Sequence, residues 1–313
     1  MTSHALGVAH ERNNRKKSFT FLWGAMTATL TALFLTIPVA AQSPGTQDQK
    51  PGQPQSTGEP DLINPDRPGL ADGSSVIGPK RFQIESGIQE EFRRNGDTVE
   101  HTFFLPTLLR LGINSHWEAR IEGNTFTRIT NFDSANITGQ TSGFAPVSLG
   151  FKYHIYDSKA EHQTSLGTIV RVFPTWGSYD FRTQHMTGDL RLAADWNFAP
   201  SLKLSLNPNV GVGRYEDDQG KLFTAGLFAV TLNYLPTKKL NPFFDVGVQV
   251  PEETDGESFA IIDTGVAYII GRNVQLDASI GTGAHGNTPP HPFVGFGISF
   301  RSKSFDRERR HHR

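Results

Sequence analysis

The residues of this sequence that could do chemistry are ionisable side chains at every second position of otherwise apolar segments. Glu118, Arg120 and Glu122 alternate with apolar residues in one such segment, and Asp189 and Arg191 do so in another. Alternate positions of an extended strand share one face, and charges on a buried face need partners. The candidates for an inward-facing, pore-lining set are Glu85, Arg110, Glu118, Arg120, Glu122, Lys152, Arg171, Asp189, Arg191, Asp195, Lys203, Asp245, Asp263 and Asp277.

This set of charges has two interpretations. Both signs occur on neighbouring segments, so the side chains could form cross-strand pairs that fill and stiffen an interior. The same charges could instead select a solute that passes between them. Three phenylalanines, Phe243, Phe259 and Phe293, share the polar face by parity and could line a path for an aromatic solute.

Catalytic and cofactor chemistry has little support. The chain has no cysteine, which excludes disulfides, thiol nucleophiles and Cys-ligated metals. It has no Gly-x-Ser-x-Gly elbow, phosphate loop, dinucleotide fingerprint or zinc-binding His-x-x-x-His pair. His154 falls on a polar face, His101 has no adjacent serine, and His285 and His291 stand in loop sequence. We expect no enzyme, no cofactor and no metal site.

The charge balance argues against nucleic acid as a partner. The chain has 30 basic and 31 acidic residues, for a formal net charge of −1 at pH 7. The basic residues form no helical stripe that could follow a phosphate backbone. They gather instead near the N-terminus and in the last residues, 301–313.

The elements that would position these residues are strands. Apolar and polar residues alternate with a period of two from Arg81 onward, as in strands with two unlike faces. The alternation predicts twelve strands, at 81–92, 99–112, 117–124, 147–155, 163–173, 189–198, 202–212, 222–235, 244–250, 258–270, 274–280 and 294–300.

The connections between these strands alternate in length, which favours an all-β, single antiparallel transmembrane barrel. Short turns at one rim and longer loops at the other are typical of outer-membrane barrels. Six aromatic residues near strand ends would form an interfacial girdle: Trp117, Tyr153, Trp196, Phe198, Tyr234 and Tyr268. A soluble sandwich or lipocalin-like barrel alternates too, so periodicity leaves open which face is inside. Glycines recurring on the polar face favour a lumen.

The two ends differ from this body. Residues 1–41 combine a basic start, an apolar stretch and a small-residue site, which predicts a cleaved signal peptide, with an uncleaved anchor as the alternative. The predicted domains are then a disordered Pro/Gly/Gln-rich linker at 42–60, the barrel at 61–300 and a basic tail at 301–313. Within the barrel segment, residues 66–69 are either a capped turn or a stretch that enters the periplasmic mouth.

Several short strings are spread over this body: Asp66-Arg67-Pro68-Gly69, residues 81–87, 108–112, 117–120 and 149–153, and Pro174-Thr175-Trp176-Gly177. They resemble the bacterial outer-membrane family of transporter-like β-barrels named for the MetA pathway of phenol degradation. The resemblance covers roughly residues 61 to 301 and is most specific from Leu108 to Arg120. It implies an outer-membrane β-barrel that passes hydrophobic or aromatic compounds. The family's barrels often end on an aromatic residue read by the assembly machinery, whereas residues 301–313 follow Phe300 here.

Together these patterns predict an outer-membrane channel or transporter for small hydrophobic or aromatic solutes. Passage would be passive, through a lumen that twelve strands keep narrow and mixed charges make selective. The expected partners are outer-membrane lipid, the outer-membrane assembly machinery and a small solute. The alternatives are a non-conducting barrel with a structural or surface-binding role and, with less support, an outer-membrane lipid hydrolase.

The orientation of the two faces is testable by cell fractionation. A barrel with an apolar outer face should appear in the outer-membrane fraction and migrate differently on gels before and after boiling. Recovery from the soluble periplasm, with one mobility at both temperatures, would contradict this orientation and favour the soluble barrel.

Overall fold

The computed structural model describes residues 61–133, 136–158, 163–254, 256–286 and 290–304. The predicted signal peptide, the linker and residues 305–313 of the tail lie outside the described residues. The described strands are β1 (Arg81–Asn95), β2 (Thr98–Gly112), β3 (Trp117–Asp133), β4 (Asn136–Gly143), β5 (Ser148–Asp157), β6 (Thr164–Phe173), β7 (Thr187–Ala199), β8 (Leu204–Glu216), β9 (Leu222–Tyr234), β10 (Leu240–Val250), β11 (Phe259–Ile270), β12 (Val274–His285) and β13 (Phe293–Arg301), with a short 3-10 helix η1 (Pro200–Leu202) before β8.

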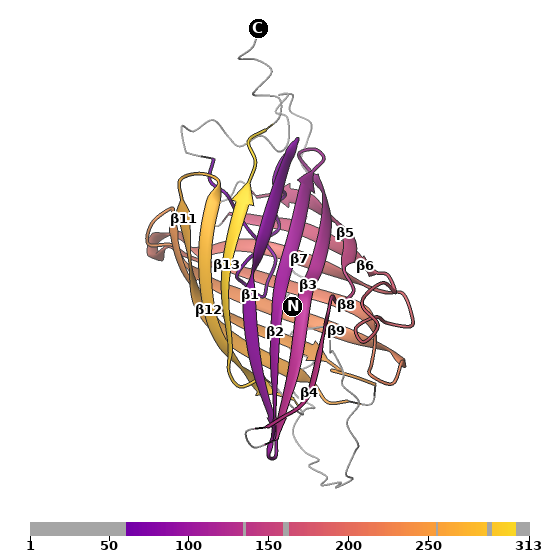
Figure 1. The fold of residues 1–313 in the computed structure, drawn as a ribbon. Coiled ribbons are helices and arrows are strands. Elements are labelled where there is room, and N and C mark those ends of the chain that lie inside the picture. The colour runs from indigo at the N-terminus through magenta and orange to yellow at the C-terminus, as the bar shows by residue number, and fades with distance from the viewer. Residues whose placement is uncertain (1–60, 134–135, 159–162, 255, 287–289, 305–313) are drawn as a thin grey trace, which may run out of the picture. The chain divides into compact units, whose positions relative to one another are not determined.

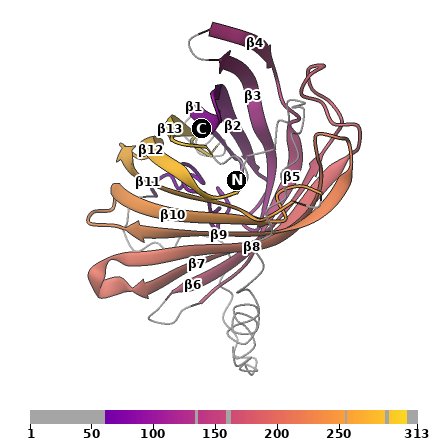
Figure 2. The same ribbon diagram turned by 90° about the horizontal axis from the view of Figure 1, so that it is seen from below.

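The strands close into an antiparallel barrel. Each barrel strand pairs with the next along the chain, and β1 pairs with both β2 and β13, which removes the free edges. Twelve strands form this ring, as predicted, and Figure 2 shows them around the lumen. The last barrel strand ends at Arg301, one residue inside the segment predicted as tail. Among the described residues, no helix is long and apolar enough to cross a membrane.

One strand was not predicted. The stretch 128–142, expected as a loop, contains the end of β3 and most of β4, and β4 pairs with β3 beyond the ring. The sequence of β4 is NITGQTSG, in which Ile137 is the one large apolar residue. A strand that buries neither face does not need alternating apolar and polar residues, so the hydrophobic pattern of the sequence does not reveal it.

The side chains decide which face is inside. Lys152 and Glu118 are 0% exposed, whereas the outward Phe151 beside Lys152 is 52% exposed. The same inversion runs round the barrel, with charged and amide side chains inside and exposed apolar side chains outside. A soluble barrel requires the reverse arrangement, and a bilayer requires this one.

The two rims differ as expected. The short-turn rim is the end of the barrel at which β1 begins and β13 ends. The turns from β2 to β3 and from β11 to β12 also lie at this rim. The opposite, long-loop rim carries β4 and the connection 174–186. Aromatic rings gather at the short-turn rim, where Trp117 and Tyr153 lie 4.6 Å apart between centroids and Trp196 and Phe198 5.8 Å apart. Such amphipathic rings suit a membrane interface.

The outward apolar face should tolerate a charge only near its rims. Leu192, in the middle of β7, is 45% exposed on this face. Leu192→Arg should lower the free energy of unfolding in lipid bilayers by about 2–4 kcal/mol, measured by denaturant titration. The control Leu202→Arg changes a 63% exposed residue of η1 at the short-turn rim and should cost about 0–1 kcal/mol. Equal losses for both variants would contradict the lipid assignment.

Candidate functional site

A stretch without regular secondary structure, residues 61–80, occupies part of the barrel interior, and we call it the luminal segment. It starts at the short-turn rim, where the Asp61 carboxylate lies 2.5 Å from the Arg81 guanidinium and 3.1 Å from that of Arg301. It ends at the same rim, where the Lys80 N–H donates to the Gly112 carbonyl at 3.0 Å. Between these points it reaches into the lumen and returns, and Figure 1 shows it in indigo among the strands.

Asp66 is the centre of the charge network that holds this segment. Its carboxylate accepts hydrogen bonds from Arg120 Nη1 at 2.5 Å and Lys152 Nζ at 2.8 Å, and Arg110 Nη1 lies 3.5 Å away. Burial alone would raise the pKa of Asp66, but these three cations hold that pKa well below its usual range. Asp66 therefore stays ionised and bridges three strands.

Arg67 holds the innermost turn of the segment. Its backbone N–H donates to Glu85 at 2.9 Å, and its Nη2 donates to Asp277 at 3.0 Å. Two glycines make room for the guanidinium, because a Cβ at Gly87 would lie 2.8 Å from Arg67 Nη2 and one at Gly297 would lie 2.5 Å from Nε. Glycines on the polar face thus provide lumen space, as the sequence indicated.

The returning half of the segment pairs with β3 and β7. Asp72 accepts from Arg120 Nη2 at 3.0 Å, the Ser74 N–H donates to Asp195 at 3.1 Å, and the Ile77 N–H donates to Glu118 at 3.0 Å. Residues against the segment come from every one of the twelve barrel strands: Glu85, Arg110, Arg120, Lys152, Ser165, Asp195, Asn209, Thr231, Asp245, Ile261, Asp277 and Arg301. The luminal segment therefore spans the cross-section of the lumen in its short-turn half.

A second network ties the strands to each other. Arg171 donates to Asp189 through Nε at 2.9 Å and through Nη2 at 2.6 Å, a two-point pair. The same guanidinium reaches Glu122 at 2.8 Å, and the Tyr215 hydroxyl donates to Asp189 at 3.0 Å. Cross-strand pairing was one of the two interpretations of the charged set, and it is the arrangement that the structure shows here.

The predicted pore-lining residues face the interior, with one exception. All of the set except Lys203 are buried or half-buried inside the barrel. The prediction for Lys203 is wrong: this residue precedes β8 in a left-handed conformation, with φ of 59°. Its side chain is exposed at the short-turn rim and donates to the Pro236 carbonyl at 2.8 Å. The predicted strand began at residue 202, two residues before β8, and side chains outside a strand do not alternate between its two faces.

For residues 66–69, the structure favours the second interpretation, a segment inside the mouth of the barrel. Asp66 and Arg67 stand in a motif of the sequence, but neither they nor Asp72 were predicted as partners of the luminal charges. Three charges without periodicity in a polar stretch give no local signal for their position. One feature of the sequence did point to such partners: the predicted strands place many charged side chains in a narrow lumen, and charged groups there require partners.

The long-loop half of the lumen has a different lining. On β9, the inward residues Phe223, Ala225 and Leu227 are buried near the long-loop rim, whereas Thr231 and Asn233 follow toward the short-turn rim. The three phenylalanines placed on the polar face by parity are indeed inward, with Phe243, Phe259 and Phe293 at 4–7% exposure. Near the long-loop rim the wall is therefore apolar and aromatic on β9, β11 and β13, and charged on β6 and β7, where Arg171 pairs with Asp189. Phe243 lies nearer the short-turn rim, beside Asn233.

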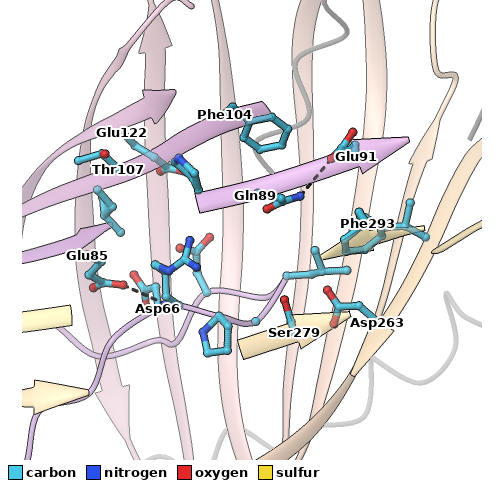
Figure 3. A pocket seen from close by; sticks show the side chains of 18 of the residues that line it. Asp66, Glu85, Gln89, Glu91, Phe104, Thr107, Glu122, Asp263, Ser279 and Phe293 are labelled. Atoms are coloured by element: carbon cyan, nitrogen blue, oxygen red, sulfur yellow. Dashed lines mark hydrogen bonds between the residues drawn. The ribbon is translucent and has the colours of Figure 1, made fainter. Parts of the chain in front are cut away.

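A cavity of about 130 Å³ lies against the innermost turn, and we call it the outer chamber (Figure 3). The luminal segment contributes residues 66–70 and 72 to its lining. Its walls combine the aromatic rings of Phe104, Phe259 and Phe293 with carboxylates that include Glu122 and Asp263. Within the described residues, no group of three or more His, Asp or Glu side chains is arranged to hold a metal ion.

Comparisons with known proteins agree with this barrel. A family model described as "Putative MetA-pathway of phenol degradation" matches residues 65–302. A solved outer-membrane channel of Pseudomonas putida F1 is 11% identical, with a TM-score of 0.54 over 77% of this chain and 100% of the channel. At that identity the likeness shows the fold alone.

Two further solved structures are less similar. The β domain of the Bordetella autotransporter BrkA is 14% identical, with a TM-score of 0.45 over 70% of this chain and 98% of that domain. The toluene transporter TodX of Pseudomonas putida is 8% identical, with a TM-score of 0.40 over 76% of this chain and 96% of that protein. None of the curated proteins compared with the chain matches it.

Arg110 should be the most costly luminal residue to neutralise. Its guanidinium donates to Glu118 at 2.7 Å and Glu85 at 3.0 Å, and to the carbonyls of Asn64 and Ser75. Arg110→Met would leave two buried carboxylates without this cation and should lower the free energy of unfolding by about 3–5 kcal/mol.

The measurement is denaturant unfolding in lipid bilayers, with Arg128→Met as the control. Arg128 is an exposed residue of β3 that lies over the Phe103 ring, 5.6 Å from its centroid, and its loss should cost about 0–1 kcal/mol. A loss below 1 kcal/mol for Arg110→Met would show that the network around Asp66 does not support the fold.

Proposed function

This chain belongs to the family of the MetA pathway of phenol degradation, and we propose that it is an outer-membrane channel or transporter for small apolar or aromatic solutes. The apolar outer face and the aromatic rings of the short-turn rim support the outer membrane as its location. The family and the barrel fold favour transport over enzymatic activity.

The observation that carries this proposal is the outer chamber, whose wall is partly aromatic, beside the luminal segment. The outer chamber, with its aromatic rings, is a place where a small apolar solute can leave water. Beyond it the luminal segment spans the barrel, attached by hydrogen bonds and ion pairs. Passage is then a two-step process in which a solute enters the chamber and crosses when the segment shifts.

One observation favours the alternative of a non-conducting barrel. The luminal segment is in contact with all twelve strands, and its charges are matched by buried partners. A segment that never moves would leave a barrel with a structural or surface-binding role. The two functions differ in a single property, the ability of the segment to move while the barrel stays folded.

A reversible tether tests this property directly. The hydroxyls of Ser74, on the segment, and Ser165, on β6, lie 2.5 Å apart, so Ser74→Cys with Ser165→Cys places two thiols within disulfide reach. The chain has no other cysteine that could compete. Oxidation should abolish the uptake of a small aromatic solute by proteoliposomes, and a reductant should restore it.

The controls are the two single-cysteine variants, in which oxidation should leave uptake unchanged. Equal uptake in the oxidised and reduced double variant would show that solutes pass without movement of the segment. An absence of uptake in the reduced double variant and in the wild type alike would overturn the channel and favour the non-conducting barrel.

A further inference from the structure

Two carboxylates face each other beside the outer chamber, and one of them, Asp263, lines it. Asp245 on β10 and Asp263 on β11 are directly paired residues of neighbouring strands and both point inward. Their side chains lie out of solvent, at 0% and 5% exposure. Like charges at such a position repel one another, so the arrangement needs a compensating group.

The described residues supply that group only in part: the two carboxyl groups lie within hydrogen-bond reach of each other, and the Thr231 hydroxyl reaches Asp245. The Leu70 N–H donates to Asp245 Oδ2 at 3.1 Å, but Oδ1 of Asp245 and Oδ1 of Asp263 are buried without a hydrogen-bond partner among the described residues. No lysine or arginine of the described chain forms an ion pair with either carboxylate, in contrast to Asp277, which has Arg67 at 3.0 Å. A buried acceptor without a donor is costly, and Asp263 is one of the residues that line the chamber.

The rest of the lining cannot compensate either. Acidic residues of the chamber outnumber basic ones: Asp66, Asp72, Glu85, Glu91, Glu122 and Asp263 stand against Arg67, Arg93 and Arg120. Each of these arginines is already engaged, with Asp277, Glu91 and Asp66 respectively. Of the described acidic residues that line the chamber, Asp263 is the one without an ion pair to a lysine or arginine, since Glu85, Glu91, Asp66, Asp72 and Glu122 each have one.

The wall beside Asp263 is apolar and aromatic. Phe259, Ile261 and Phe293 form a buried cluster against which Leu70 packs. Gly281 allows the ring and the carboxylate to come together, because a Cβ there would overlap both Phe293 and Asp263. Figure 3 shows Asp263 and Phe293 on the same side of the cavity. An aromatic face next to a carboxylate is suited to an organic cation, through charge-assisted hydrogen bonds and cation–π contact.

We infer that the outer chamber binds a small primary amine, with its ammonium group on Asp263 and one aromatic ring against Phe259 and Phe293. The cavity of about 130 Å³ is close to the roughly 150 Å³ that holds a benzene molecule, so it fits a single ring. A divalent metal ion would need six or more oxygen ligands, which two carboxylates beside an aromatic wall do not provide. The inference rests on the proposed function in that this amine is the solute, but binding can be measured without transport.

The test compares three ligands of one size and three charges: benzylamine, benzyl alcohol and benzoate. Calorimetric titration of the purified full-length protein in detergent at neutral pH should give the highest affinity for benzylamine, a lower one for benzyl alcohol and no binding of benzoate. Equal affinities for the amine and the alcohol would overturn the inference, because a carboxyl pair that shares one proton would serve a neutral hydroxyl equally well.

The variant Asp263→Asn keeps the shape of the side chain and removes its charge. Benzylamine affinity should fall about tenfold, as expected for replacing a charge-assisted hydrogen bond by a neutral one, while the affinity for benzyl alcohol should stay within about twofold. Asp133→Asn, the same change at an exposed position at the end of β3, is the control and should alter neither. Heat-modifiable gel mobility confirms that each variant is folded.

The outcomes separate the site from the proposed function. Benzylamine that binds the wild type but does not enter proteoliposomes would support the site and contradict the channel. Uptake of neutral aromatic solutes without preferential amine binding, or an Asp263→Asn variant with unchanged affinity, would contradict the site and leave the channel in place.

Discussion

The structure depends on the pairing of charges that the barrel has taken out of water. A bilayer forces apolar side chains outward, so the alternation of a strand brings every second, polar residue into a narrow interior. Ionised groups there are stable only with partners, and the strands alone do not provide all of them. Arg120 and Lys152 find their closest acceptor in Asp66, which no barrel strand contributes. The luminal segment completes an electrostatic network that the barrel leaves unfinished.

This dependence explains why the lining of the lumen is uneven. Where the segment lies, the walls carry Arg, Lys, Asp and Glu, and glycines at Gly87 and Gly297 admit Arg67. Nearer the long-loop rim, β9 and β11 carry Phe223, Leu227 and Phe259, which need no polar partner, while Arg171 and Asp189 pair with each other. One chamber remains at the boundary between the two linings, and Asp263, which has no lysine or arginine partner among the described residues, lines it. A binding site at this boundary follows from the same rule of charge pairing, because it is the place where the rule is not fulfilled by the protein itself.

The sequence allowed much of the barrel to be predicted, because lipid and lumen impose opposite demands on alternate residues of each strand. The twelve strands, the inward charges and the inward Phe243, Phe259 and Phe293 all follow from that period. It fails where the demand is absent: β4 buries neither face, and Lys203 stands beyond the end of a strand in a left-handed turn. The luminal segment could not be placed, since its contacts join residues far apart, such as Asp61 and Arg301, and no local pattern records them.

The pairing of β1 with β13 constrains the order in which the barrel and its luminal segment can fold. These two strands come from opposite ends of the barrel sequence, and their pairing closes the ring. The luminal segment leads directly into β1, so the chain has to pull it inside before the ring closes or thread it through a finished rim. Until Arg301 arrives beside Asp61 and Asp277 beside Arg67, these charges of the luminal segment lack their final partners. During biogenesis of such a barrel, the first described residues of the chain therefore gain their final ion-pair partners only when the last strand is in place.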